Sequence, residues 1–110
     1  MKIAVTATGP TLTADMDTRF GRCPYFLLVD TDSLEFEAVD NNNNAQGSGA
    51  GIQSAQMLAQ RQVTTVLTGN CGPNAIQTLS AAGINVFLGQ SGTISAVVER
   101  FKAGELKPTS

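Results

Sequence analysis

The sequence predicts an α/β fold in which three helices cover one five-stranded mixed sheet. Short, β-rich apolar runs fill the first half of the chain, and strand-like and helix-like patterns alternate in the second half. Turn residues and glycines separate these segments. A chain of 110 residues, 42% of them hydrophobic, has enough apolar surface for one core, so we expect a single domain over residues 1–110.

Three strands are expected in the first half of the chain. Residues 2–7 (KIAVTA) and 25–30 (YFLLVD) are apolar runs that turn residues bound. Residues 34–39 alternate, which predicts a strand with Leu34, Phe36 and Ala38 on one face and two glutamates on a wet face. The turn residues 30–33 predict an antiparallel hairpin between the last two strands.

The second half predicts three helices and two further strands. Residues 65–68 and 84–88 are short apolar runs that are typical of buried strands. Pro73 and Gly83 are expected to begin and end one helix, and Gly104 to end another. The apolar positions at helical spacing are Ile52, Ala55, Leu58 and Ala59, then Ile76 and Leu79, then Ile94, Val97, Val98 and Phe101.

This element order predicts the topology of the sheet. A meander followed by two right-handed crossovers gives the strand order 3-2-1-4-5, in which only the second strand is antiparallel. The loops at 8–24, 40–51, 69–73 and 89–93 would then meet at one edge. A ligand crevice is expected there, because the chain reverses direction across the sheet between the first and fourth strands.

Composition excludes several classes of function. Without histidine, the chain cannot form a Ser-His-Asp triad, a Cys-His dyad or a histidine metal site. A net charge of −2 argues against nucleic acid as a partner. The apolar runs are too short to cross a membrane, so a cytoplasmic protein is expected. Two cysteines far apart make neither a disulfide framework nor a four-ligand zinc site.

The predicted loop edge carries the sulfur-bearing side chains Cys23, Cys71 and Met16. The two cysteines are either small buried hydrophobic residues or soft ligands that face the crevice. In the second interpretation, thiolates and the Met16 thioether would bind a soft ion such as Cu(I) or a metal–sulfur cluster.

Glycines and arginines on the same edge predict an anion site. Glycines precede each helix, and backbone N–H groups at helix starts bind anions. Arg19 and Arg22 should make the crevice locally positive, and the nearby Asp15 and Asp17 are expected to be solvated turn residues. The residues predicted to contact the ligand are Arg19, Phe20, Gly21, Arg22, Gly47, Gly49, Gly51, Gly69, Asn70 and Gly72.

Three segments resemble the dinitrogenase iron–molybdenum cofactor biosynthesis family: MKIAV at residues 1–5, RFGRCPYF at 19–26 and GNCGPNA at 69–75. The resemblance implies a ribonuclease H-like fold without nuclease activity. It also implies an anionic metal–sulfur cluster as ligand, with a molybdenum–copper sulfide favoured and an iron–molybdenum type possible. Cluster donor or acceptor proteins would be its partners.

The sequence departs from this family where many members carry a histidine. Thr18 and Arg19 occupy that place here. Two binding modes remain: Cys23 or Cys71 bonds the metal, or backbone N–H groups and arginines hold an anionic cluster without a protein–metal bond.

Three functions follow as hypotheses. The preferred one is a cluster-binding or carrier protein that is not an enzyme. The second is a thiol enzyme or redox sensor that uses Cys23 and Cys71, which predicts depressed thiol pKa values. The third is a regulatory interaction module whose crevice binds a partner.

Overall fold

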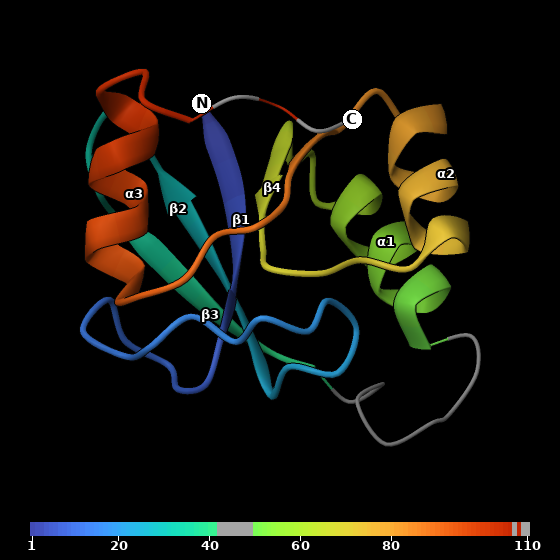
Figure 1. The fold of residues 1–110 in the computed structure, drawn as a ribbon, viewed down its shortest axis with the longest axis horizontal. Coiled ribbons are helices and arrows are strands. Elements are labelled where there is room, and N and C mark those ends of the chain that lie inside the picture. The colour runs from blue at the N-terminus through green and yellow to red at the C-terminus, as the bar shows by residue number, and fades with distance from the viewer. Residues whose placement is uncertain (42–49, 107, 109–110) are drawn as a thin grey trace.

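One five-stranded sheet with helices on both faces organises the chain (Figure 1). The computed structural model describes residues 1–41, 50–106 and 108. The elements are β1 (Lys2–Ala7), β2 (Tyr25–Asp30), β3 (Phe36–Asp40), α1 (Ala50–Gln60), β4 (Thr65–Leu67), α2 (Pro73–Ala81), β5 (Asn85–Phe87) and α3 (Ile94–Lys102). Their order in the sheet is β3-β2-β1-β4-β5, and β2 is antiparallel to its neighbours while β1, β4 and β5 are parallel. The predicted fold is confirmed.

The central strand β1 is buried on both faces because its side chains alternate between two cores. Ala4 belongs to the cluster beneath α1 and α2, whereas Ile3 and Val5 belong to the cluster beneath α3. Figure 1 shows α3 on one side of the sheet and α1 with α2 on the other. A near-continuous apolar run is therefore what this position requires.

The three helices are short and amphipathic. The helix α1 has 11 residues, and α2 and α3 have nine each. Leu58 of α1, Leu79 of α2 and Val97 of α3 are completely buried, as their helical spacing predicts. In the part of the chain that the structure describes, no helix is long and apolar enough to span a membrane.

The edge strand β3 corrects one prediction. It begins at Phe36, because Leu34 has a φ of +63° and donates its N–H to the Asp30 carbonyl at 2.8 Å. The predicted buried face is wrong: Phe36 is 42% exposed and Ala38 is exposed. The alternation is present, but the only described residue of β3 that packs against a core cluster is Val39, on the α1 side, and the face of Phe36 and Ala38 stays exposed.

Candidate functional site

The loops that follow β1, β4 and β5 meet at one edge of the sheet, as predicted. Residues 15–17 extend the sheet beside the end of β1, where Asp17 N donates to the Thr6 carbonyl at 2.9 Å. Met16 N donates to the Gly92 carbonyl at 2.7 Å, and Gly89 N to the Gly69 carbonyl at 2.9 Å. Gly47 and Gly49 lie outside the described residues.

Two of these loops, residues 17–23 and 69–75, are joined into what we name the loop rim. A short parallel bridge links them: Phe20 N donates to the Asn70 carbonyl at 2.9 Å, and Asn70 N to the Thr18 carbonyl at 2.6 Å. Gly69 is buried at this contact, where an added Cβ would lie 2.6 Å from the Thr18 Cβ and 2.9 Å from its carbonyl oxygen. Gly69 therefore serves the close approach of the two loops.

Arg19 is held on the loop rim by Asp17. The Asp17 carboxylate accepts from Arg19 Nε at 3.1 Å and Nη2 at 3.0 Å, and from the Arg19 backbone N–H at 2.9 Å. Hydrogen bonding from Arg19 lowers the pKa of Asp17, although burial opposes that shift. The expectation that Asp17 is a solvated turn residue is wrong, because it is only 6% exposed.

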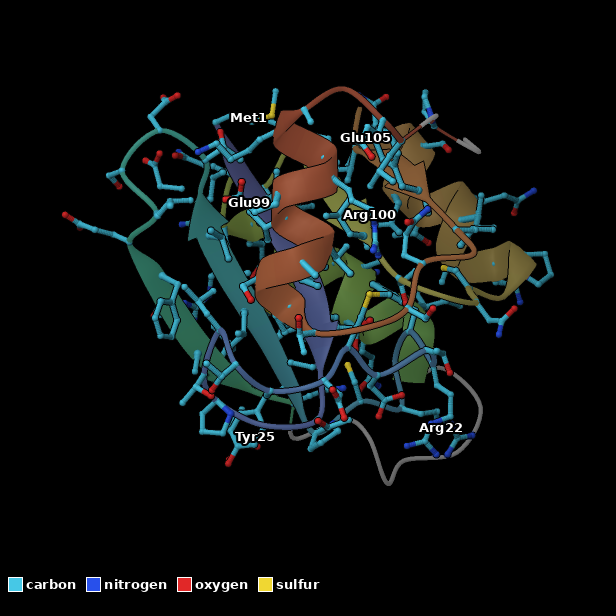
Figure 2. The ribbon with its side chains drawn as sticks, turned by 60° about the vertical axis from the view of Figure 1, so that its left-hand side comes forward. Met1, Arg22, Tyr25, Glu99, Arg100 and Glu105 are labelled. Carbon is cyan, nitrogen blue, oxygen red and sulfur yellow. The ribbon has the colours of Figure 1, made fainter. Side chains whose placement is uncertain are left out.

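The loop rim carries less net positive charge than the sequence predicts. Asp17 balances the charge of Arg19, whose side chain is nevertheless 65% exposed. Arg22 is exposed and forms no ion pair with any described residue. Figure 2 shows it at the loop end of the molecule, far from Met1 and Glu105. Free positive charge on the loop rim therefore rests chiefly on Arg22.

Phe20 and Gly21 shape the turn that presents the two arginines. Arg22 N donates to the Arg19 carbonyl at 3.2 Å, and Gly21 has a φ of +87°, which favours glycine at this position of a turn. The Phe20 ring is buried edge-to-face against Phe26, with ring centroids 5.5 Å apart. The contact of Phe20 and Gly21 with a ligand stays a prediction, and in the structure both residues hold the turn in place.

Asn41 is a residue that the sequence analysis missed. It is buried, and its Nδ2 donates to the Cys23 carbonyl at 2.8 Å and to the Gly21 carbonyl at 3.2 Å. Ser54 Oγ of α1 donates to Asn41 Oδ1 at 3.4 Å. The side chain thus ties the arginine-bearing turn to α1. A polar residue directly after a strand is a candidate for a loop contact of this kind. Asn41 was missed because it begins a run of four asparagines that reads as one loop.

We expect Asn41→Ala to lower the free energy of unfolding by about 2 kcal/mol, because it leaves buried carbonyl groups without a donor. Urea denaturation would measure this loss. Asn74→Ala is a suitable control, because Asn74 is exposed. Equal stabilities of Asn41→Ala and the parent chain would contradict the assigned role.

The three sulfur atoms do not form one ligand set. Cys23 is completely buried in the cluster beneath α1 and α2, and half-buried Cys71 packs against that cluster. Met16 is buried in the cluster beneath α3, on the other face of the sheet. Within residues 1–41, 50–106 and 108, no group of three or more His, Cys, Asp or Glu side chains could hold a metal ion.

The cysteine thiols are also less acidic than usual. Burial raises the pKa of Cys23 to about 12, and the negative charge of Asp17 adds to this shift. Burial alone raises the pKa of Cys71 to about 11. The redox hypothesis predicts that the pKa values of these thiols are lowered. The raised values contradict that prediction.

We expect both thiols to stay neutral at pH 7 and to react slowly with a thiolate-selective reagent. Unfolding exposes thiols that ionise near pH 8.5, so stability should fall as pH rises from about 8.5 toward the higher folded-state pKa values. Thiol absorbance during a pH titration, together with urea denaturation at each pH, would test this. An ionisation midpoint below 8.5 for either native thiol would contradict it.

The N-terminus of α2 offers backbone donors on the loop rim. Its N-cap is Gly72, which supplies no side-chain cap, and the first turn holds no acidic residue. The N–H groups of exposed Asn74 and buried Ala75 have no acceptor in the described part of the chain. Gly51 of α1 packs close by, where an added Cβ would lie 3.2 Å from the Ala75 Cβ.

The N-terminus of α3, in contrast, is closed. The Thr93 side chain accepts from Ala96 N at 3.3 Å, and Ile94 N donates to the Ala14 carbonyl at 2.9 Å. Ser95 N donates to the Leu12 carbonyl at 3.0 Å. Other loops therefore already hydrogen-bond the turns at Gly89 and Gly92. Of the α2 and α3 starts, only that of α2 has N–H groups without an acceptor among the described residues.

The sheet order and the loop rim define a small α/β protein of ribonuclease H-like topology. The chain belongs to the dinitrogenase iron–molybdenum cofactor family, whose model matches residues 1–104. It is 42% identical to the apo form of the orange protein from Desulfovibrio gigas, with a TM-score of 0.93 over 99% of this chain and 96% of that one.

Two further proteins are similar. The NMR structure of a candidate NifB protein from Thermotoga is 32% identical, with a TM-score of 0.83 over 97% of this chain and 91% of that one. A Methanocaldococcus jannaschii protein is 28% identical over 95 residues, which are 84% of this chain and 80% of that protein. The matches thus cover 80% or more of the length of each of these three relatives.

Proposed function

We propose that this chain binds or carries an anionic, molybdenum-containing metal–sulfur cluster at the loop rim and is not a catalyst. One observation carries the proposal: the Arg19–Asn70 bridge fixes, on one rim, the exposed guanidinium of Arg19 and the start of α2, where the N–H of exposed Asn74 has no acceptor among the described residues. Membership in the iron–molybdenum cofactor family and the likeness to the orange protein support a cluster as the ligand.

The chemistry of the rim favours capture of an anion over direct metal bonding. Helix N-termini and arginines hold anions through N–H donors and charge, and neither needs a deprotonated ligand. Cys23 is completely buried in the core, so its thiol cannot contact a ligand in this conformation. A molybdenum–copper sulfide is the favoured cluster and an iron–molybdenum cluster the alternative, with donor or acceptor proteins as partners.

Cys71 keeps a second binding mode open. It is half-buried, and it directly precedes Gly72 at the start of α2. A soft metal can displace the proton of a thiol even where its pKa is raised, at a cost in affinity. In this alternative, one thiolate would bond the metal while the same arginines and amides hold the rest of the cluster.

Anaerobic mixing of the protein with sulfide and with molybdenum, copper or iron salts tests the proposal. After removal of free reagents, we expect visible absorption together with bound molybdenum in elemental analysis. Protein that retains neither metal nor colour under every combination would overturn the proposal. Unfolded protein carried through the same steps is the control for non-specific metal sulfide.

A further inference from the structure

The outer edge of β3 is open for strand pairing. β3 ends the sheet, and among the described residues it pairs only with β2. Asp30 N donates to the Glu35 carbonyl and Asn41 N to the Pro24 carbonyl, both at 2.9 Å, so residues 35 and 41 face β2. Because the pairing alternates along an antiparallel ladder, Phe36, Ala38 and Asp40 present their N–H and C=O groups outward. No described residue pairs with these groups.

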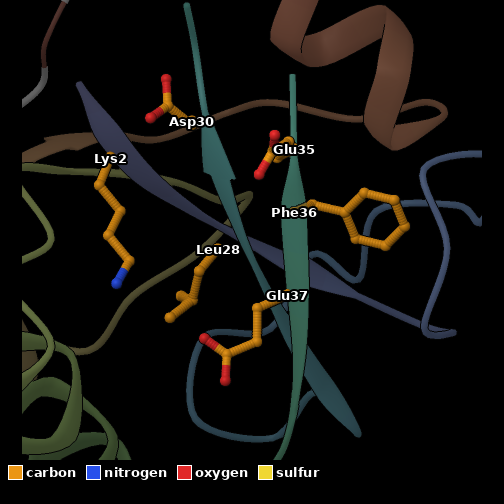
Figure 3. Close-up of a pocket in the computed structure, with 6 residues that line it drawn as sticks. All are labelled: Lys2, Leu28, Asp30, Glu35, Phe36 and Glu37. Atoms are coloured by element: carbon orange, nitrogen blue, oxygen red, sulfur yellow. The ribbon is translucent and has the colours of Figure 1, made fainter. Parts of the chain in front are cut away.

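The two faces of this edge differ in chemistry. On the α1 side, Lys2, Leu28 and Glu37 point into a shallow pocket of about 320 Å³, which Asp30 and Glu35 also line (Figure 3). Figure 3 shows Phe36 pointing to the opposite side of the strand. Phe36 and Leu34 are the large hydrophobic side chains of this hairpin that remain 42% and 39% exposed. The pocket face therefore carries Glu35, Glu37 and Asp30 beside Lys2, whereas the opposite face carries Phe36 and, by alternation, Asp40.

Acidic residues are concentrated around this edge. The segment 30–40 holds five of the nine acidic residues of the chain and no basic residue: Asp30, Asp32, Glu35, Glu37 and Asp40. Arg61 pairs with Glu37 at 3.2 Å and the N-terminus with Asp32 at 3.4 Å, but the side chains of these pairs are 41% to 89% exposed. Exposed pairs contribute little, so the edge keeps its negative character.

We propose that β3 accepts an extended segment of a partner protein in which lysine or arginine alternates with apolar residues. The partner's backbone pairs with Phe36, Ala38 and Asp40. Its basic side chains lie over the acidic pocket, and its apolar side chains pack against Phe36. Strand addition of this kind takes affinity from main-chain bonds and specificity from alternate side chains.

Charge complementarity decides between this partner and a second copy of the chain. Pairing β3 with another β3 would bring two sets of the same acidic side chains together, and opposed like charges destabilise strand pairs. A basic segment instead offsets the acidic groups. The docking surface does not depend on the proposed cluster, and its Asp40 end adjoins Asn41, which contacts Gly21 and Cys23 of the loop rim.

Capped seven-residue peptides that alternate valine with lysine test the proposal. We expect the Val/Lys peptide to shift the NMR signals of β3 and slow amide exchange at Phe36, Ala38 and Asp40 several-fold. A Val/Glu peptide should cause neither change. Two N-methylated Val/Lys peptides, one methylated at the valines and one at the lysines, separate strand pairing from simple charge attraction. Only alternate N–H groups of an added strand face β3, so we expect one of the two methylated peptides to lose binding. Full binding by both methylated peptides would overturn the proposal.

Charge variants complete the test. Glu35→Lys and Glu37→Lys should each weaken Val/Lys binding about tenfold, whereas Glu105→Lys, a charge-matched change distant in sequence from β3, should not. Equal weakening by all three variants would contradict docking at β3. No binding of the Val/Lys peptide, or concentration-dependent dimers that Ala38→Pro abolishes, would likewise overturn the proposal.

Discussion

Gly69→Ala is expected to lower the free energy of unfolding by about 3 kcal/mol, the largest stability loss that we foresee for a single methyl group. Its Cβ would lie within 3 Å of the Cβ, Cα and carbonyl oxygen of Thr18. Two of these atoms are backbone, so relief requires the two rim loops to separate. Thermal and urea denaturation would measure the loss, and NMR should show lost protection at Phe20 N, whose acceptor is Asn70.

Gly72→Ala is the matched control, since the two glycines lie in the same loop. An added Cβ at Gly72 meets nothing within 4 Å, and its backbone is extended. We expect a cost of at most about 1 kcal/mol, from the poorer N-cap that alanine provides. Equal losses from the two variants would show that the close contact with Thr18 does not limit stability.

Replacing both rim arginines, Arg19→Gln with Arg22→Gln, should weaken cluster retention about tenfold or more. Each charge-assisted hydrogen bond to an anion contributes roughly 1.5–3 kcal/mol, and this variant removes the side chains that could donate them. The measurement is molybdenum bound per protein after anaerobic loading and repeated desalting. Retention equal to that of the parent chain would contradict a role for the arginines.

Two controls separate charge from folding in this experiment. Arg61→Gln with Lys102→Gln changes the net charge equally, but these residues lie at the ends of α1 and α3, outside the loop rim. Removing Arg19 leaves Asp17 buried without its partner, so Asp17→Asn with Arg19→Gln and Arg22→Gln should restore stability. Cluster retention should stay low in that triple variant and normal in the control.

The fold was largely predictable because its signals are local and agree with one another. Apolar runs, Pro73 at a helix start and the hairpin residues 30–33 each indicate the element that forms. Topology then followed from general rules on short, right-handed connections. β3 shows the limit: alternation indicates a strand, but whether a helix covers its apolar face depends on the lengths and positions of distant elements.

The meeting of the loops at one edge of the sheet was predictable, but the contacts within these loops were not. Sequence places Asp17, Cys23 and Asn41 in loops, where polar groups are usually solvated. The structure buries all three, because the loops pack on the sheet and each other. Burial raises the pKa values of the two thiols, and it places the Asp17 carboxylate beside Arg19. No local sequence pattern encodes this burial.

The most direct test of the central claim, that charge and backbone rather than thiolates hold the cluster, is the metal content of Cys23→Ala with Cys71→Ala. Loaded anaerobically beside the parent chain and the double arginine variant, it should retain molybdenum at the level of the parent. Molybdenum lost with the cysteines but kept without the arginines would contradict the claim and assign the cluster to Cys71 ligation.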